Sequence, residues 1–208
     1  MLHLETLTPE AKEFFPHLAA FASDFYLAGG TALALQIGHR ISVDFDLFSP
    51  EPIKRTLLEK VENYAKDRVE VFVNDSRELT VLSHGVKHTF LHYPFPVVLP
   101  FETNEPLDLL CAKEILVTKA YTIGRRGALK DYINLFIGLT TQTTTLEEVM
   151  RLAREKYAEA FNDRLFLEQL LYLDDTAPDA MRMLGRVTPT KQEIIDFFSS
   201  KIKEVFLS

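Results

Sequence analysis

Near the start of the chain, a glycine pair followed by a threonine has the residue types that can bind phosphate. Gly29 and Gly30 give a backbone without side chains, which can approach a phosphate closely, and Thr31 is suited to cap the helix that follows. The N–H groups in the first turn of that helix would then face the phosphate. The run therefore predicts a phosphate-binding turn.

A second run, shortly after the first, contains two carboxylates. Asp44 and Asp46 are two positions apart in an extended segment, so both side chains leave one face of a strand, while Val43, Phe45 and Leu47 face the other. Adjacent carboxylates repel each other unless a cation lies between them. Oxygen ligands suit Mg²⁺, which binds through one or two carboxylates plus substrate phosphates. Together the two runs predict a site for a nucleoside triphosphate and its Mg²⁺ or Mn²⁺ ion.

The strands and helices expected around these two runs would position their side chains. Residues 25–28 are expected to form a short strand, residues 31–37 a helix closed by Gly38, and residues 41–48 the strand that carries the aspartates. This is the βαβ-like start of a mixed sheet. A further helix is expected over residues 53–67.

The rest of the chain divides into a β-rich and a helical part. Residues 69–73, 79–83 and 86–93 read as an antiparallel meander. The proline-rich segment that follows, residues 93–100, is the best candidate for a boundary between two domains. From about residue 107 the chain is expected to be helical. We predict an α+β protein, with a mixed sheet flanked by helices over residues 1–100 and a helical domain over residues 101–208 that completes the nucleotide site.

Composition limits the class of protein. The 208 residues are 47% hydrophobic and carry a formal net charge of −7, which argues against a protein that coats nucleic acid by bulk electrostatics. A single cysteine, Cys111, excludes an internal disulfide and a multi-cysteine zinc site, and a buried, inert thiol is expected there. With no signal-peptide pattern and no long apolar run, we expect a soluble, cytoplasmic protein that does not associate with a membrane.

The motif as a whole resembles a known family. The Gly-Gly-Thr-Ala-Leu turn at residues 29–33 and the Arg-Ile-Ser-Val-Asp-Phe-Asp strand at residues 40–46 are similar to the hallmarks of the AbiEii/AbiGii-type toxins. That family belongs to the DNA polymerase beta superfamily of nucleotidyltransferases. The resemblance implies that Arg40 and Ser42 join the glycine turn in binding nucleotide. For Ser42, a hydrogen bond to a neighbouring strand is an equally good interpretation.

A second block supports the resemblance. The family has a Lys on a later helix, an Arg about two turns on, and then an Arg/Lys-Asp pair; the matching residues here are Lys119, Arg126 and Lys130-Asp131. The resemblance implies that Lys119 and Arg126 reach the β and γ phosphates, on one helix face if the helix continues that far. A solvated basic face is the structural alternative. Asp131 either binds nucleotide, acts as a base, caps the next helix or pairs with Arg126.

Two positions depart from the family pattern. Asn134 stands where the family has a second Asp, and Thr89 stands where the superfamily often has a third metal carboxylate that also serves as the base. Glu70, on the preceding strand, is an alternative donor. His88 and His92 are interpreted as edge or surface histidines, because no third ligand accompanies them at metal-binding spacing.

These observations lead to one leading hypothesis. The resemblance implies a metal-dependent nucleotidyltransferase, the toxin of a bacterial type IV toxin–antitoxin or phage-defence pair, with a cognate antitoxin as a possible partner. Asp44 and Asp46 would hold the metal, and an acceptor hydroxyl of RNA, such as a tRNA end, or of a protein would attack the α-phosphorus and expel pyrophosphate. Lys119 and Arg126 would offset the charge on the pyrophosphate.

The competing hypothesis is a degenerate member of the family that binds nucleotide, transfers nothing and acts through a partner protein. Thr89 and Asn134 favour it. A metal-dependent phosphohydrolase is a third possibility, which the lack of a His-Asp cluster disfavours.

Overall fold

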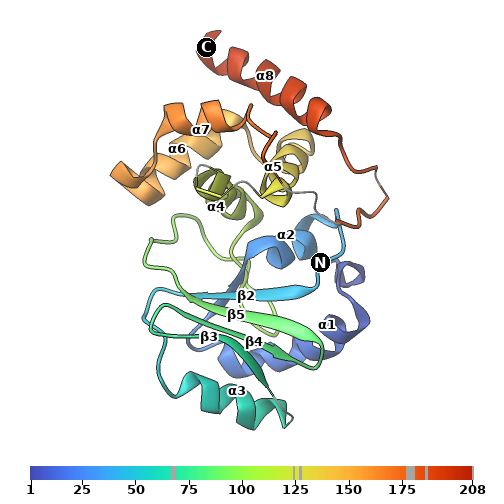
Figure 1. Cartoon of the computed structure of the whole chain (residues 1–208), viewed down its shortest axis with the longest axis vertical. Helices are drawn as coiled ribbons and strands as arrows, with labels where there is room; N and C mark the ends of the chain where they lie inside the picture. Colours follow the sequence, from blue (N-terminus) through green and yellow to red (C-terminus); the bar gives the residue numbers. More distant parts are fainter. Residues whose placement is uncertain (67–68, 124, 127, 177–180, 186, 208) are drawn as a thin grey trace. The chain divides into compact units, whose positions relative to one another are not determined.

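The computed structural model describes residues 1–66, 69–123, 125–126, 128–176, 181–185 and 187–207. The chain divides into two compact units, Met1–Cys111 and Ala112–Ser208. The first is built on a five-stranded sheet with helices beside it, and the described part of the second is helical (Figure 1). The predicted α+β class is confirmed.

The sheet of the first unit is mixed. Its strands are β1 (Tyr26–Ala28), β2 (Asp44–Ser49), β3 (Glu70–Asn74), β4 (Glu78–Ser83) and β5 (Val86–His92). They lie in the order β1-β2-β5-β4-β3, so β5 occupies the centre of the sheet. β2 pairs parallel with β5, and all other neighbours pair antiparallel, which confirms the meander predicted for β3, β4 and β5.

The start of the sheet differs from the predicted βαβ-like arrangement. Helix α2 (Gly29–Ile37) connects β1 to β2, but the two strands run antiparallel, with Ala28 opposite Asp46. After the helix, the Ser42 N–H donates to the Thr6 carbonyl at 2.7 Å, which holds the chain against the N-terminal segment. The chain therefore enters β2 from the end of the sheet at which β1 finishes.

One face of the sheet packs against the N-terminal helices. Phe45 on β2 and Phe90 on β5 are buried and contact the rings of Phe15 and Phe21, at centroid distances of 6.1 and 4.9 Å. These two rings belong to the 3-10 helix η2 (Phe15–Phe21), which follows helix α1 (Pro9–Phe14). Helix α3 (Leu57–Ala65) lies on the same side, and α2 lies on the opposite side (Figure 1).

Two predictions about the side chains of this face are wrong. The strand predicted over residues 41–48 begins only at Asp44, so Val43 lies before it and its side chain is 58% exposed. His88 is not a surface residue: it lies on the central strand, is 1% exposed, and packs between the rings of Phe14 and Phe45 at 4.3 and 5.8 Å. Burial, which penalises the charged imidazolium, lowers the pKa of His88 to about 4.

The segment before the second unit remains with the sheet. Residues 107–111 were expected to be helical, but Leu109 and Leu110 are extended: the Leu27 N–H donates to the Asp108 carbonyl, and the Leu110 N–H donates to the Leu27 carbonyl. Cys111, the last residue of the first unit, is buried as predicted.

The second unit consists of helices with well-defined starts. They are α4 (Ala112–Ile123), α5 (Leu129–Thr140), α6 (Leu146–Tyr157), the 3-10 helix η3 (Ala158–Ala160), α7 (Asp163–Gln169) and α8 (Lys191–Leu207). The spacing of Thr145 with Glu148, and of Thr190 with Glu193, predicts a capping box at two helix starts. Both are confirmed: Thr145 Oγ1 accepts from the Glu148 N–H at α6, and Thr190 and Glu193 bond each other reciprocally at α8.

The core of this unit contains a buried ion pair. Lys156 Nζ on α6 donates to Glu114 Oε1 on α4 at 2.6 Å, and both side chains are 0% exposed. Gly138 on α5 faces Leu116 on α4, where a Cβ would lie 2.3 Å from Leu116 Cδ1. Helix α4 is therefore fixed by a charge pair toward α6 and by close packing toward α5.

The His88 environment predicts how stability depends on pH. The folded protein keeps His88 neutral down to about pH 4, whereas the unfolded chain takes up a proton below pH 6.5, so stability is full above pH 6.5 and falls as the pH drops toward 4. The full effect is about 3 kcal/mol. Urea unfolding of wild type and His88→Leu at pH 7 and pH 5 should show a smaller pH dependence in the variant. This account would be contradicted if the free energy of unfolding fell by the same amount between pH 7 and pH 5 in both proteins.

The buried pair predicts an asymmetry between single and double variants. Glu114→Met leaves the Lys156 ammonium buried without its carboxylate and should lower the free energy of unfolding by about 3–5 kcal/mol. Glu114→Met combined with Lys156→Met removes both charges and should recover most of that loss. Chemical denaturation of the three proteins measures the difference, and a double variant as unstable as the single one would refute it.

Candidate active site

The carboxylate of Asp46 lies directly against the glycine turn. Gly29 is the first residue of α2 and has a φ of +67°, and a Cβ built on it would lie 2.0 Å from Asp46 Oδ2. Only glycine fits this position, since a side chain would both strain the backbone and collide with the carboxylate. The expected phosphate-binding turn and one of the expected metal ligands are therefore neighbours.

The second glycine makes room for a guanidinium. A Cβ on Gly30 would lie 2.0 Å from Arg40 Nη2, so Arg40 packs over the start of α2. Its other terminal nitrogen donates to the Ile41 carbonyl at 2.9 Å and to Ser42 Oγ at 3.1 Å. Arg40 and Ser42 thus join in a buried polar cluster at the first turn of the helix.

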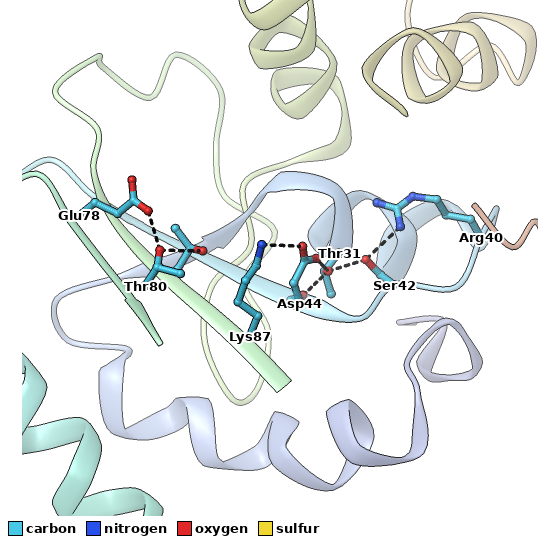
Figure 2. Close-up of polar contacts among 8 residues, drawn as sticks. Thr31, Arg40, Ser42, Asp44, Glu78, Thr80 and Lys87 are labelled. Atoms are coloured by element: carbon cyan, nitrogen blue, oxygen red, sulfur yellow. Dashed lines mark hydrogen bonds and ion pairs between the residues drawn. The ribbon is translucent and has the colours of Figure 1, made fainter. Parts of the chain in front are cut away.

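Thr31 does not cap the helix, contrary to the prediction. The helix begins at Gly29 after Ala28, with no side-chain cap, so Thr31 is already inside the first turn. Its hydroxyl instead lies 2.6 Å from Ser42 Oγ and donates to the main-chain carbonyl of Asp44 (Figure 2). Thr31 therefore fastens the helix to the strand that carries the carboxylates.

Asp44 and Asp46 project from the same face of β2, as their spacing predicts. They pair across the strands with Lys87 and Thr89 of β5, and paired residues share a face of the sheet. Asp44 is 23% exposed, and its Oδ2 lies 4.0 Å from Lys87 Nζ. Asp46 is also partly exposed, so both carboxylates are accessible on the face of the sheet that lies beside α2.

The strands beyond β2 extend this polar row. Thr89 lies beside Asp46 and opposite Thr80 of β4, and Thr80 Oγ1 donates to Glu78 Oε1 at 2.6 Å (Figure 2). Glu70, the alternative carboxylate proposed from the sequence, lies on the edge strand β3 opposite Leu82 of β4, and it is exposed. Lys87, Thr80 and Glu78 were not identified from the sequence, because only the strand register places them next to the motif.

The two aspartates fit a divalent ion. They offer only oxygen donors on one accessible face, beside helix N–H groups that can face phosphates, as Mg²⁺ or Mn²⁺ requires when it binds together with a nucleotide. Among the described residues, no group of three or more His, Cys, Asp or Glu side chains could hold a metal. An ion here would therefore be held by Asp44 and Asp46.

The second block of predicted site residues forms a cluster within the helical unit. Asp131, on α5, is 0% exposed and accepts from Lys119 Nζ at 2.7 Å and from Arg126 Nε at 2.9 Å. Helix α4 ends at Ile123, so Arg126 lies beyond it and shares no helix face with Lys119. Gly124 and Gly127 of the same block lie outside the described residues.

The two cations of this cluster lower the pKa of Asp131 and differ from each other in exposure. Burial tends to raise the pKa of Asp131, but the neighbouring Lys119 and Arg126 cations outweigh it and hold the pKa of this carboxyl below its usual range. Lys119 is 7% exposed, whereas Arg126 is 55% exposed and can reach a ligand. Asn134, one turn farther along α5, is buried.

No helix in the described residues has the length and apolar character that crossing a membrane requires.

The chain is similar to known proteins in sequence and in fold. The chain is 31% identical over 185 residues to the uncharacterized protein aq_aa25 of Aquifex aeolicus, covering 88% of each chain. Its fold resembles that of MenT4, a nucleotidyltransferase toxin of Mycobacterium tuberculosis, with a TM-score of 0.60, 18% identity and coverage of 91% of this chain and 83% of that one. JHP933 of Helicobacter pylori has a TM-score of 0.55 at 14% identity, with 95% and 92% covered.

The model of one protein family matches most of the chain. Residues 16–198 match the family described as "Nucleotidyl transferase AbiEii toxin, Type IV TA system", where TA denotes toxin–antitoxin. The matched range includes the glycine turn, both aspartates and the Lys119–Asp131–Arg126 cluster. The chain therefore belongs to the AbiEii nucleotidyltransferase toxin family.

Proposed function

We propose that this protein transfers a nucleoside monophosphate from a nucleoside triphosphate to a hydroxyl group, with Mg²⁺ or Mn²⁺ held by Asp44 and Asp46. The observation that supports this most directly is the contact of Asp46 with Gly29. It supports the proposal because the carboxylate proposed to bind the metal lies beside helix N–H groups that can receive phosphates. The acceptor is an RNA, such as a tRNA end, or a protein, and the setting is the cytoplasm.

The residues of the first unit bind and orient the nucleotide in this proposal. The N–H groups at the start of α2 face the phosphates, while Arg40 and Thr31 hold that turn against β2. The divalent ion, when bound, supplies positive charge at the reacting phosphate. The acceptor oxygen attacks the α-phosphorus, and the bond to the departing pyrophosphate breaks.

The basic cluster of the second unit is proposed to bind the phosphates that leave. Arg126 is the more exposed cation and contacts them, while Lys119 adds charge from a buried position. A carboxylate with a lowered pKa is a weak base, so Asp131 serves better to hold the two cations than to accept a proton. We propose a positioning role for Asp131.

In the cell, we propose that the protein is the toxin of a type IV toxin–antitoxin or phage-defence pair with a cognate antitoxin, as its family implies. One observation favours an alternative, in which the protein binds nucleotide without transfer and acts through a partner. Thr89, and not a carboxylate, lies beside Asp46. The two proposals differ in whether pyrophosphate is released.

The first test is label transfer with a matched pair of variants. Purified protein, Mg²⁺, total tRNA or lysate, and each labelled nucleoside triphosphate should give a labelled acceptor and pyrophosphate. Asp46→Asn removes one metal-binding charge at nearly constant shape and should lower transfer by about 100-fold or more. Glu70→Gln alters a carboxylate on the edge strand and should leave transfer unchanged. Nucleotide-dependent thermal stabilisation without transfer would support the alternative.

A second test separates ligand binding from stability in the basic cluster. Arg126→Gln removes a largely exposed cation but keeps an amide that can donate to Asp131, so it should raise the KM for the nucleotide about tenfold with a smaller loss of Tm than Lys119→Met. Lys119→Met leaves the buried Asp131 with one partner fewer and should lower the free energy of unfolding by about 3 kcal/mol. Nucleotide kinetics and thermal unfolding measure both effects, and an unchanged KM in Arg126→Gln would exclude its contact with phosphate.

A further inference from the structure

The strand next to the two aspartates presents a cation and a hydroxyl to them. In the parallel pair of β2 and β5, Lys87 lies opposite Asp44 and Thr89 lies opposite Asp46. Lys87 Nζ is 4.0 Å from Asp44 Oδ2, and its side chain is 50% exposed. Figure 2 shows the Lys87 ammonium group directed at the Asp44 carboxylate.

The carboxylate on the next strand is already engaged. Glu78 Oε1 accepts from Thr80 Oγ1 at 2.6 Å, and Thr80 Oγ1 is 3.3 Å from Thr89 Oγ1. Thr80 is buried, so this hydroxyl is held within the sheet surface. The described neighbours of Asp44 and Asp46 on β5 thus add a positive charge and no negative one.

This distribution of charge limits how many metal ions the protein can hold. A two-ion centre keeps its ions about 3.5–4 Å apart and needs enough negative charge to offset their repulsion. Two carboxylates and one ammonium carry a net charge of −1, so a single bound divalent ion already reverses the sign. A second divalent ion would be repelled by both the first ion and the Lys87 ammonium.

We propose that the protein itself holds one divalent ion, with Asp44 and Asp46 as its ligands, and that the Lys87 ammonium supplies the positive charge that a second ion provides in two-ion enzymes. Lys87 then has two effects. It weakens binding of the ion to the free protein, and it keeps positive charge next to Asp44 when the nucleotide is present. The catalytic meaning of this arrangement rests on the proposed transfer reaction, whereas the number of ions does not.

The test is a titration of the full chain with Mn²⁺ in the absence of nucleotide. The electron paramagnetic resonance signal of free Mn²⁺ reports how many ions are bound and how tightly. Wild type should bind one ion. Lys87→Gln should bind one ion about tenfold more tightly at low salt, because one charge a few ångströms from the ion is removed in a largely aqueous setting. Lys54→Gln is the matched control, since Lys54 pairs with Asp24 at 2.7 Å elsewhere in this unit, and it should bind as wild type does.

A third variant tests the role of Thr89. Thr89→Asp places a carboxylate beside Asp46 and should raise the number of bound ions to two, and Lys87→Gln in that background should tighten the second ion. Two ions in wild type, or equal affinity in Lys87→Gln and wild type, would overturn the proposal, as would the absence of bound Mn²⁺ in every variant. Normal Mn²⁺ binding without nucleotidyl transfer would instead reject the proposed function alone.

Discussion

The contact between the Asp46 carboxylate and the backbone of Gly29 is the constraint on which the site depends. It requires a residue without a Cβ and with a φ of +67° where α2 begins, and it requires β2 to lie antiparallel beside β1 so that Asp46 arrives opposite Ala28. The Thr31 hydroxyl then joins the helix to Asp44, and Arg40 covers Gly30. The helix end proposed to bind phosphate and the carboxylate pair are thus joined by direct contacts.

Buried charge is paired in the described part of the helical unit. Every buried carboxylate described in the helical unit has a cation in contact: Glu114 has Lys156, and Asp131 has Lys119 and Arg126. Such pairs add little net stability, because desolvation offsets most of the attraction, but removing one partner is costly. They therefore fix geometry more than they stabilise it, which suits the proposed role of this cluster in presenting Arg126 to a ligand.

The sequence predicted the local features well and the long-range ones poorly. Capping at Thr145 and Thr190 and the shared face of Asp44 and Asp46 depend on residues close in sequence, where spacing determines geometry. His88 was misplaced because alternation along a strand does not reveal that the strand lies at the centre of the sheet.

The same limit applies to the site. Thr31 has the residue type of a cap, but a tertiary contact with Asp44 decides its role. Lys87 lies beside Asp44 only through the parallel register of β2 and β5, which no local pattern encodes.

The division of the chain at residue 111 has a consequence for synthesis. Each compact unit is continuous in sequence, since Met1–Cys111 forms one and Ala112–Ser208 the other. All five strands of the described sheet and both proposed metal ligands therefore precede the basic cluster in the order of synthesis, and domains generally fold as units in that order. The glycine turn and the Asp46 carboxylate can thus assemble on the nascent chain before Lys119, Arg126 and Asp131 have emerged from the ribosome.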